Sequence, residues 1–152
     1  MSWNTEKATQ ELLAVLPLLT RIVAAEVRRE AGEETTMPQF RVLSHLTAEP
    51  LTMSVLAKKR RVTLQSMSEL VQSLVGRGWV ARLPDPRDRR QSLLHLTDEG
   101  RRHYEQATQY TLRSLVPLME QLSQAEMDAI RIALPALRRV LTQEEGNTPD
   151  ER

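Results

Sequence analysis

The stretch VTLQSMSELVQSLVGRGWVARLPDPRDRRQSLLHLTDEG, residues 62–100, decides the fold. Its first part repeats apolar residues at spacings of three, one, three and one, at Met67, Leu70, Val71, Leu74 and Val75. This spacing makes one face of a 3.6-residue helix, so we predict a helix over residues 63–77. Thr63 can cap its start. Gly76 and Gly78 bracket its end, where a left-handed backbone favours glycine.

Two short strands and a basic loop follow this helix. Residues 79–83 and 92–96 are rich in strand-forming side chains, and the prolines and aspartate of residues 84–91 mark a turn between them. Three arginines concentrate positive charge on a tip narrow enough for a minor groove, where negative potential attracts arginine. Asp88 lies two residues before Arg90 and can hold its guanidinium in one direction. A solvated, charged hairpin tip is the alternative interpretation.

The outer face of the predicted helix carries short polar groups in its first turns. These are Thr63, Gln65, Ser66 and Ser68. Hydroxyls and amides of this size reach base edges and phosphates without filling a major groove. A polar outer face is ordinary on a surface helix, so the helix alone does not decide between solvation and DNA contact. The arginine-rich loop that follows favours DNA contact.

A shorter helix is predicted upstream. Thr35 or Thr36 can cap it, Pro38 suits its first turn, and residues 49–50 end it after about residue 48. A second short helix over residues 53–60 comes next.

Thr52 caps this second short helix, Leu51 before it is an extended link, and residues 61–62 turn into the helix over residues 63–77. Helix, short turn and helix in this spacing predict a helix-turn-helix. The cationic run Lys58-Lys59-Arg60-Arg61 suits either a solvated helix end or phosphate contact.

Long helices are predicted on both sides of this central part, over residues 5–31 and in two segments after Thr97. Prolines inside them predict kinks, at Pro17, Pro117 and Pro135. Their apolar faces are wider than one small core requires, which favours packing against a partner over an isolated amphipathic helix. Residues 143–152 are polar and are predicted to be disordered.

Charge is unevenly distributed along the 152 residues, a length that suits one domain or a two-lobed subunit. Residues 57–103 carry eleven Lys or Arg and five Asp or Glu, a balance of +6, whereas the remainder carries ten and fifteen, a balance of −5. A basic middle between acidic ends indicates a local polyanion contact. The net charge of +1 argues against a general nucleic-acid coating protein, and an aromatic content of 3% argues against base-stacking on single strands.

Several function classes find little support. The chain has no cysteine, which excludes disulfides and thiol switches and fits a cytoplasmic location. We recognise no secretory signal, and uninterrupted apolar runs are far shorter than a membrane span, so no membrane partner is expected. His45, His95 and His103 lack metal-ligand spacing, and no phosphate-binding glycine loop is present. We therefore expect no metal, no cofactor and no enzymatic activity.

The central stretch resembles the multiple-antibiotic-resistance regulator (MarR) family of winged helix-turn-helix transcription factors. The resemblance rests on Asp88-Arg89-Arg90 followed by Leu96-Thr97-Asp98-Glu99-Gly100, and on the pattern of residues 51–79. It extends over about residues 11–143. It implies a mainly α fold with a small β-hairpin wing (α+β). The implied parts are a helical dimerisation region at 1–34 and 98–145, a winged helix-turn-helix DNA-binding domain at 35–97 and a flexible tail at 146–152.

Regulators of this family are usually homodimeric repressors that bind a palindromic site. In that arrangement Thr63, Gln65, Ser66 and Ser68 enter the major groove, Arg89 and Arg90 reach the minor groove with Asp88 orienting Arg90, and Arg87, Lys58 and Lys59 touch phosphates. Many such regulators release DNA when a phenolic or anionic molecule enters the cleft between dimer layer and winged lobe. By position, Phe40, Arg41, Ser44 and His45 could line that cleft, although helix packing explains most of them.

Two residues depart from the family pattern. Arg61 stands where a glycine is usual in the turn, and Glu69 stands where a basic residue is common. A left-handed non-glycine residue costs roughly 1 kcal/mol, and a carboxylate repels phosphate. Both favour the alternative function, a winged-helix module that binds protein instead of DNA. An enzyme is a third alternative, but it lacks an assembled nucleophile or metal set.

Overall fold

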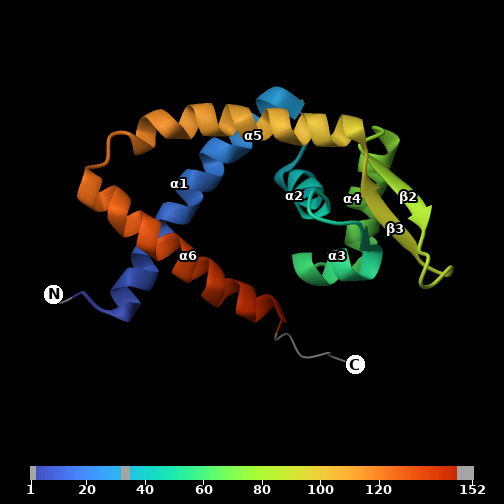
Figure 1. The fold of residues 1–152 in the computed structure, drawn as a ribbon, viewed down its shortest axis with the longest axis horizontal. Helices are drawn as coiled ribbons and strands as arrows, with labels where there is room; N and C mark the ends of the chain where they lie inside the picture. The colour runs from blue at the N-terminus through green and yellow to red at the C-terminus, as the bar shows by residue number, and fades with distance from the viewer. Residues whose placement is uncertain (1–2, 32–34, 147–152) are drawn as a thin grey trace. The chain divides into compact units, whose positions relative to one another are not determined.

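The computed structural model describes residues 3–31 and 35–146 and divides the chain into two compact units, Met1–Ser114 and Leu115–Arg152. Figure 1 labels the helices and strands along the chain. They are α1 (Thr5–Ala31), α2 (Met37–Leu46), β1 (Leu51–Thr52), α3 (Met53–Arg60), α4 (Leu64–Gly76), β2 (Val80–Pro84), β3 (Ser92–Leu96), α5 (Asp98–Met119) and α6 (Gln124–Gly146).

The sheet has three antiparallel strands in the order β1-β3-β2, one more than the predicted hairpin. The residue predicted to be an extended link, Leu51, pairs with Leu94, and Thr52 pairs with Leu93. The side chain of Leu51 is buried in the core. This position holds the backbone of the link beside β3, where it can pair. The expectation of only two strands was therefore wrong, while the mainly α fold with a small wing is confirmed.

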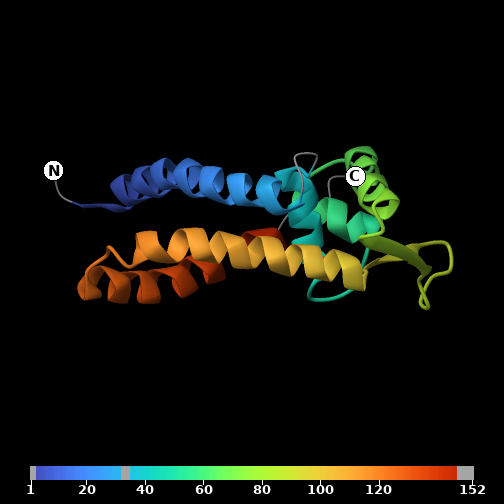
Figure 2. The ribbon, with the colours of Figure 1, turned by 90° about the horizontal axis from the view of Figure 1, so that it is seen from above.

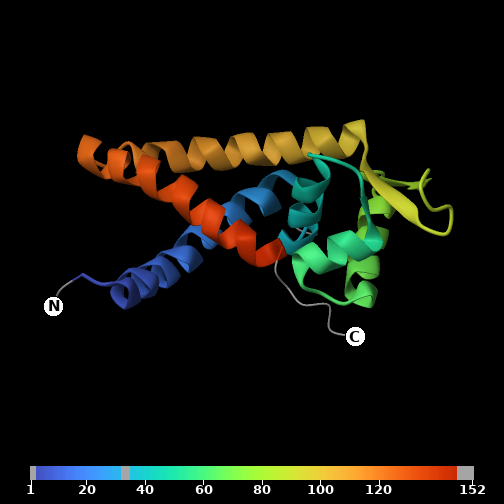
Figure 3. The ribbon, with the colours of Figure 1, turned by 60° about the horizontal axis from the view of Figure 1, so that its bottom comes forward.

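The core of the first unit lies where α2, α3 and α4 gather beside the sheet (Figure 3). The predicted apolar face of α4 supplies its centre. The buried members of this core are Val42, Leu43, Leu46, Leu51, Leu56, Ala57, Met67, Val71, Leu74, Trp79, Val80 and Leu94. Burial of one such side chain contributes about 1.5–3 kcal/mol, so this cluster holds the helix-turn-helix together.

Helix starts in this unit follow the predicted caps. The Thr36 hydroxyl accepts from the Gln39 amide, and the Gln39 side chain accepts from the Thr36 amide, which completes a capping box. The hydroxyls of Thr52 and Thr63 cap α3 and α4 by accepting from the Val55 and Ser66 amides, without the reciprocal side-chain bond of a capping box. The two glycines bracket the end of α4 as predicted: Gly76 is its last helical residue, and Gly78 has the left-handed φ of 75°.

The start of α5 is bonded to the turn that precedes β2. The Thr97 hydroxyl donates to the Gly78 carbonyl at 2.6 Å and accepts from the Gly100 amide at 3.0 Å. A Cβ on Gly100 would lie 2.1 Å from the Trp79 carbonyl oxygen. Glycine is therefore required at residue 100, because the backbone of Trp79, just before β2, lies too close to α5 for any side chain.

Helix α1 runs unbroken through Pro17 (Figure 2). Its apolar residues Leu12, Leu13, Leu16 and Leu19 remain exposed outside the core. Residues Thr5–Arg29 are also long and apolar enough to cross a membrane by length and composition alone. We expected no segment of this length because the sequence contains no uninterrupted apolar run that reaches it. That criterion misses an apolar helix that contains a few charged residues. A single helix of this kind is weak evidence for a membrane span, although none of its apolar window is buried in this chain.

The second unit contains the end of α5 and α6. Here Ser123 and Glu126 form the predicted capping box, with the Ser123 amide donating to Glu126 Oε2 at 2.7 Å and the Glu126 amide donating to Ser123 Oγ at 3.3 Å. Helix α6 continues to Gly146, so disorder from residue 143 and a tail beginning at 146 were wrong for those four residues. The remainder of the predicted tail, 147–152, lies outside the described residues.

Candidate nucleic-acid interface

The outer face of α4 presents the predicted polar groups. Gln65 and Ser66 are exposed, and Ser68 is half-buried. The hydroxyl of Thr63 is already engaged, because it accepts from the Ser66 amide at 3.1 Å and donates to Ser66 Oγ at 3.0 Å. Thr63 therefore sets the start and direction of α4, while Gln65 remains as the long polar side chain best placed to reach a base edge.

Two consecutive Asx turns build the loop between β2 and β3. Asp85 Oδ1 accepts from the Arg87 amide at 2.9 Å, and Asp88 Oδ1 accepts from the Arg90 amide at 3.0 Å. The loop is closed at its base by the Asp85 amide, which donates to the Gln91 carbonyl at 3.0 Å. Asp85 is only 8% exposed, so its carboxylate belongs to the buried base of the loop and not to the charged tip.

Asp88 holds Arg90 in the manner that the sequence predicted. The Arg90 Nε lies 3.2 Å from Asp88 Oδ1, although the Arg90 side chain is 91% exposed. Backbone and then side-chain hydrogen bonds from Arg90 lower the pKa of Asp88, with a further contribution from Gln91. Because the contact uses Nε, the terminal guanidinium nitrogens remain directed outward as donors for a phosphate or a base edge.

A groove of about 420 Å³ brings the helix and the loop together. It is lined by Met53, Ser54, Leu64, Ser68, Arg82, Arg90, Gln91, Ser92 and Leu94. Two predicted site residues, Ser68 on α4 and Arg90 on the loop, thus face one concavity. Arg82 on β2 is an additional cation there that the sequence reasoning missed. Strand alternation could have found it, because residues two apart face the same side of a strand. Arg82 therefore lies on the side of buried Val80 and directly across from its β3 partner Leu94.

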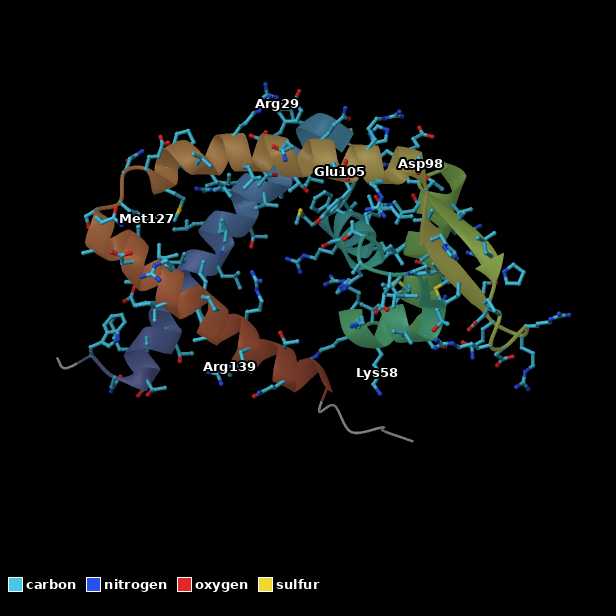
Figure 4. The ribbon with its side chains drawn as sticks, viewed as in Figure 1. Arg29, Lys58, Asp98, Glu105, Met127 and Arg139 are labelled. Atoms are coloured by element: carbon cyan, nitrogen blue, oxygen red, sulfur yellow. The ribbon has the colours of Figure 1, made fainter. Side chains whose placement is uncertain are left out.

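The remaining predicted cations lie on the surface around this groove. Arg87 and Arg89 are exposed on the loop, and Lys58 and Lys59 are exposed on α3. Figure 4 shows the Lys58 side chain extending away from α3 into solvent. The structure therefore places cations on both the helix-turn-helix and the loop, as phosphate contact on either side of a reading helix requires.

The predicted effector residues on α2 take part in packing. The Phe40 ring stacks on Tyr104 with centroids 4.9 Å apart, and the Tyr104 hydroxyl donates to Ser44 Oγ at 3.3 Å. Arg41 is exposed and His45 is half-buried. These contacts join α2 to α5, so packing accounts for Phe40 and Ser44 without a ligand.

No three His, Cys, Asp or Glu side chains come together as a metal site within residues 3–31 and 35–146. His103 stacks on Trp79 with ring centroids 4.4 Å apart and lies 3.9 Å from a Glu99 carboxylate oxygen. This histidine has a packing role.

Comparison with known proteins gives a consistent result. The sequence model of the MarR family matches residues 35–91. The multiple antibiotic resistance protein MarR of Escherichia coli is 38% identical over 77 residues, which cover 50% of this chain and 54% of MarR. The match therefore spans about half the length of this curated relative.

Solved structures extend the similarity to the whole chain. The crystal structure of RV1404 from Mycobacterium tuberculosis is 31% identical and superposes with a TM-score of 0.76, covering 100% of both chains. The apo structure of E. coli MarR is 25% identical with a TM-score of 0.74, covering 90% of this chain and 98% of MarR. Sco3205 from Streptomyces coelicolor, a MarR family transcriptional regulator solved in complex with DNA, has a TM-score of 0.69 at 23% identity, covering 99% of this chain and 94% of Sco3205. At that identity it shows the fold alone.

Proposed function

The chain belongs to the MarR family, and on that premise we propose that it is a homodimeric regulator of transcription that binds a palindromic site in double-stranded DNA. The observation that carries the proposal is that Ser68 on α4 and Arg90 on the wing line the same groove, with Arg90 held by Asp88. A reading helix and an arginine-bearing loop on one rigid lobe can engage adjacent grooves of a duplex together.

Each group has a separate task in this arrangement. Gln65, Ser66 and Ser68 face base edges in the major groove, with Thr63 capping the helix that carries them. Arg89 and Arg90 enter the minor groove, where negative potential favours arginine. Lys58, Lys59 and Arg87 contact phosphates on either side. Two copies related by a twofold axis would place their reading helices roughly 34–36 Å apart, one duplex turn.

The dimer would form through the helices outside the winged lobe. We assign residues 1–34 and 98–145 to this dimerisation region and residues 35–97 to DNA binding. The support is the apolar face that α1 leaves exposed in the single chain. We also propose a cytoplasmic location, repression rather than activation, and release of DNA by a small phenolic or anionic effector, because these properties are typical of the family. The residues of α2 give the effector no specific support.

Selection of bound fragments from the source genome, followed by gel shift and footprinting, tests the proposal. Three phosphate-contacting cations in each of two subunits predict that log K falls against log salt with a slope of roughly −5. The footprint should contain a palindrome with half-sites one turn apart. Failure of the dimer to retain any fragment at low salt would refute DNA binding.

One observation favours a second candidate, a winged-helix module that binds protein. Glu69 is exposed on α4, one turn beyond Gln65, where a carboxylate repels phosphates. Glu69→Gln separates the two functions. A DNA reader should bind nonspecific DNA more tightly after this substitution, whereas a protein-binding module should remain inactive towards DNA.

A further inference from the structure

We propose that Arg61, in the turn between α3 and α4, contacts a DNA phosphate, and that this contact explains why a strained arginine occupies a position suited to glycine. The inference rests on the proposed DNA binding and adds a positioning residue to it. Arg61 adopts φ 51° and ψ 44°, and it is the one non-glycine residue with positive φ in the described part of the chain. Backbone outliers of this kind persist where the side chain has a function.

The turn itself accounts for the backbone but not for the side chain. The Arg61 amide donates to the Lys58 carbonyl and the Val62 amide donates to the Ala57 carbonyl, both at 3.1 Å, which terminates α3 through a left-handed residue. The end of α4 uses a left-handed residue too, and there it is Gly78 at φ 75°. One chain thus meets the same requirement once with glycine and once with arginine, at a higher conformational cost.

The Arg61 side chain makes no polar contact within the described part of the chain that would offset that cost. The Arg61 residue is exposed, and it forms no ion pair or side-chain hydrogen bond within residues 3–31 and 35–146. A solvated arginine gains nothing from being held in this backbone region. The guanidinium is therefore available to a group outside the chain, and such a contact would offset the cost of the arginine.

The location identifies that group. Arg61 lies two residues before Thr63, which begins α4, and follows the exposed Lys58 and Lys59. The left-handed turn fixes its Cα rigidly beside the helix proposed to enter the major groove. Guanidinium forks bind phosphate oxygens in a bidentate manner, so an arginine fixed here sets the register of α4 on the duplex.

Four variants separate charge from backbone conformation. Arg61→Gly removes both the charge and the strain, Arg61→Asn removes the charge but tolerates the left-handed region, and Arg61→Lys keeps both. Arg29→Gln is the charge control, because it removes one exposed positive charge outside the proposed DNA-binding residues 35–97, and sedimentation checks that this variant is still a dimer. Each is tested by gel shift over a series of salt concentrations, with a fragment selected by the wild-type protein, and by thermal melting.

Loss of Arg61 should weaken binding about tenfold or more at physiological salt and lower the salt slope by roughly 1.8, since a dimer loses two phosphate contacts. Arg61→Gly and Arg61→Asn should behave alike in binding, and Arg61→Lys should retain the slope. Arg61→Gly should also melt a few degrees higher than wild type. Arg29→Gln should leave the salt slope unchanged.

Two failures are distinguishable. If the wild-type protein binds DNA and Arg61→Gly binds with the same affinity and slope, the phosphate contact is refuted while the proposed function stands. If the wild-type protein retains no fragment, the proposed function fails and takes this inference with it.

Discussion

The winged lobe (residues 35–97) buries a core of apolar residues within the chain, whereas most apolar residues of helix α1 are exposed. On α4, Met67, Val71 and Leu74 are completely buried within their own chain, whereas on α1 Leu13 is 61% and Leu16 is 54% exposed. Both helices have apolar faces of ordinary helical spacing. The difference shows that the lobe completes its core by itself, while α1 carries an apolar face that needs another surface.

We expect the largest loss of stability from adding a side chain at Gly100, where α5 lies against the backbone of Trp79. Gly100→Val would place a Cβ 2.1 Å from the Trp79 carbonyl oxygen. Only a shift of the backbone could relieve this clash. We expect a loss of more than about 3 kcal/mol in the free energy of unfolding, measured by urea denaturation. Gly76→Ala is the matched control, because a Cβ there has nothing within 4 Å. It should be neutral or stabilising by up to about 1 kcal/mol.

The exposed face of α1 is tested by a charge that only a buried interface would notice. Leu16→Asp should raise the dimer dissociation constant at least about 100-fold, since two unpaired carboxylates would be desolvated per dimer. Sedimentation equilibrium measures this change. Gln10→Asp adds the same charge to an exposed polar residue of α1 and should leave the dimer intact. Equal behaviour of the two variants would mean that α1 is not the interface.

The same contrast explains what the sequence could predict. The Thr63 cap, the buried face of α4 and the Asp88–Arg90 contact were predicted correctly because partners within four residues of one another determine each of them. The pairing of Leu51 with Leu94 was not predicted. It depends on distant segments brought together by the core, and a strand of two residues has too few side chains to show alternation.

Part of the candidate site was beyond sequence reasoning for a related reason. Asp85 and Asp88 have the same local pattern, an aspartate two residues before an arginine, yet one is buried and the other borders the tip. Only the packing of the loop against its base separates them. Likewise Arg82 joins the groove because β2 and β3 are registered so that Arg82 pairs with Leu94.

Substitutions at the wing tip should affect binding without affecting the core or the dimer. Arg90→Ala should weaken binding to the selected site by about 1–3 kcal/mol, because the Arg90 side chain has no packing role and is 91% exposed. Melting temperature and sedimentation should match wild type. Affinity equal to wild type would remove Arg90 from the interface.

Asp88→Ala distinguishes orientation from simple electrostatics. Removing a negative charge beside DNA should strengthen binding if charge alone matters. We expect weaker binding instead, by less than for Arg90→Ala, because the Asp88 carboxylate fixes the Arg90 amide and guanidinium. Gel shift over a salt series gives the answer, and tighter binding would show that the Asx turn is dispensable.

The smallest expected effect concerns two capping boxes that differ in one group. The Thr36–Gln39 box of α2 is neutral, whereas the Ser123–Glu126 box of α6 contains a carboxylate. Side-chain and backbone hydrogen bonds from Ser123 lower the pKa of Glu126. A carboxyl whose pKa is lower in the folded state stabilises it fully above the pKa of the unfolded chain, and this contribution is lost as pH falls through the folded pKa.

Amide hydrogen exchange should detect that difference. The protection factor of the Ser123 amide, which is corrected for intrinsic exchange, should decrease as pH falls through the lowered pKa of Glu126. The protection factor of the Thr36 amide should not change. Glu126→Gln should make the α6 box respond like that of α2, because a glutamine accepts the same hydrogen bond at every pH. If the Ser123 amide remained equally protected in acid, the carboxylate would have no part in holding the start of α6, and the two boxes would be equivalent despite their different chemistry.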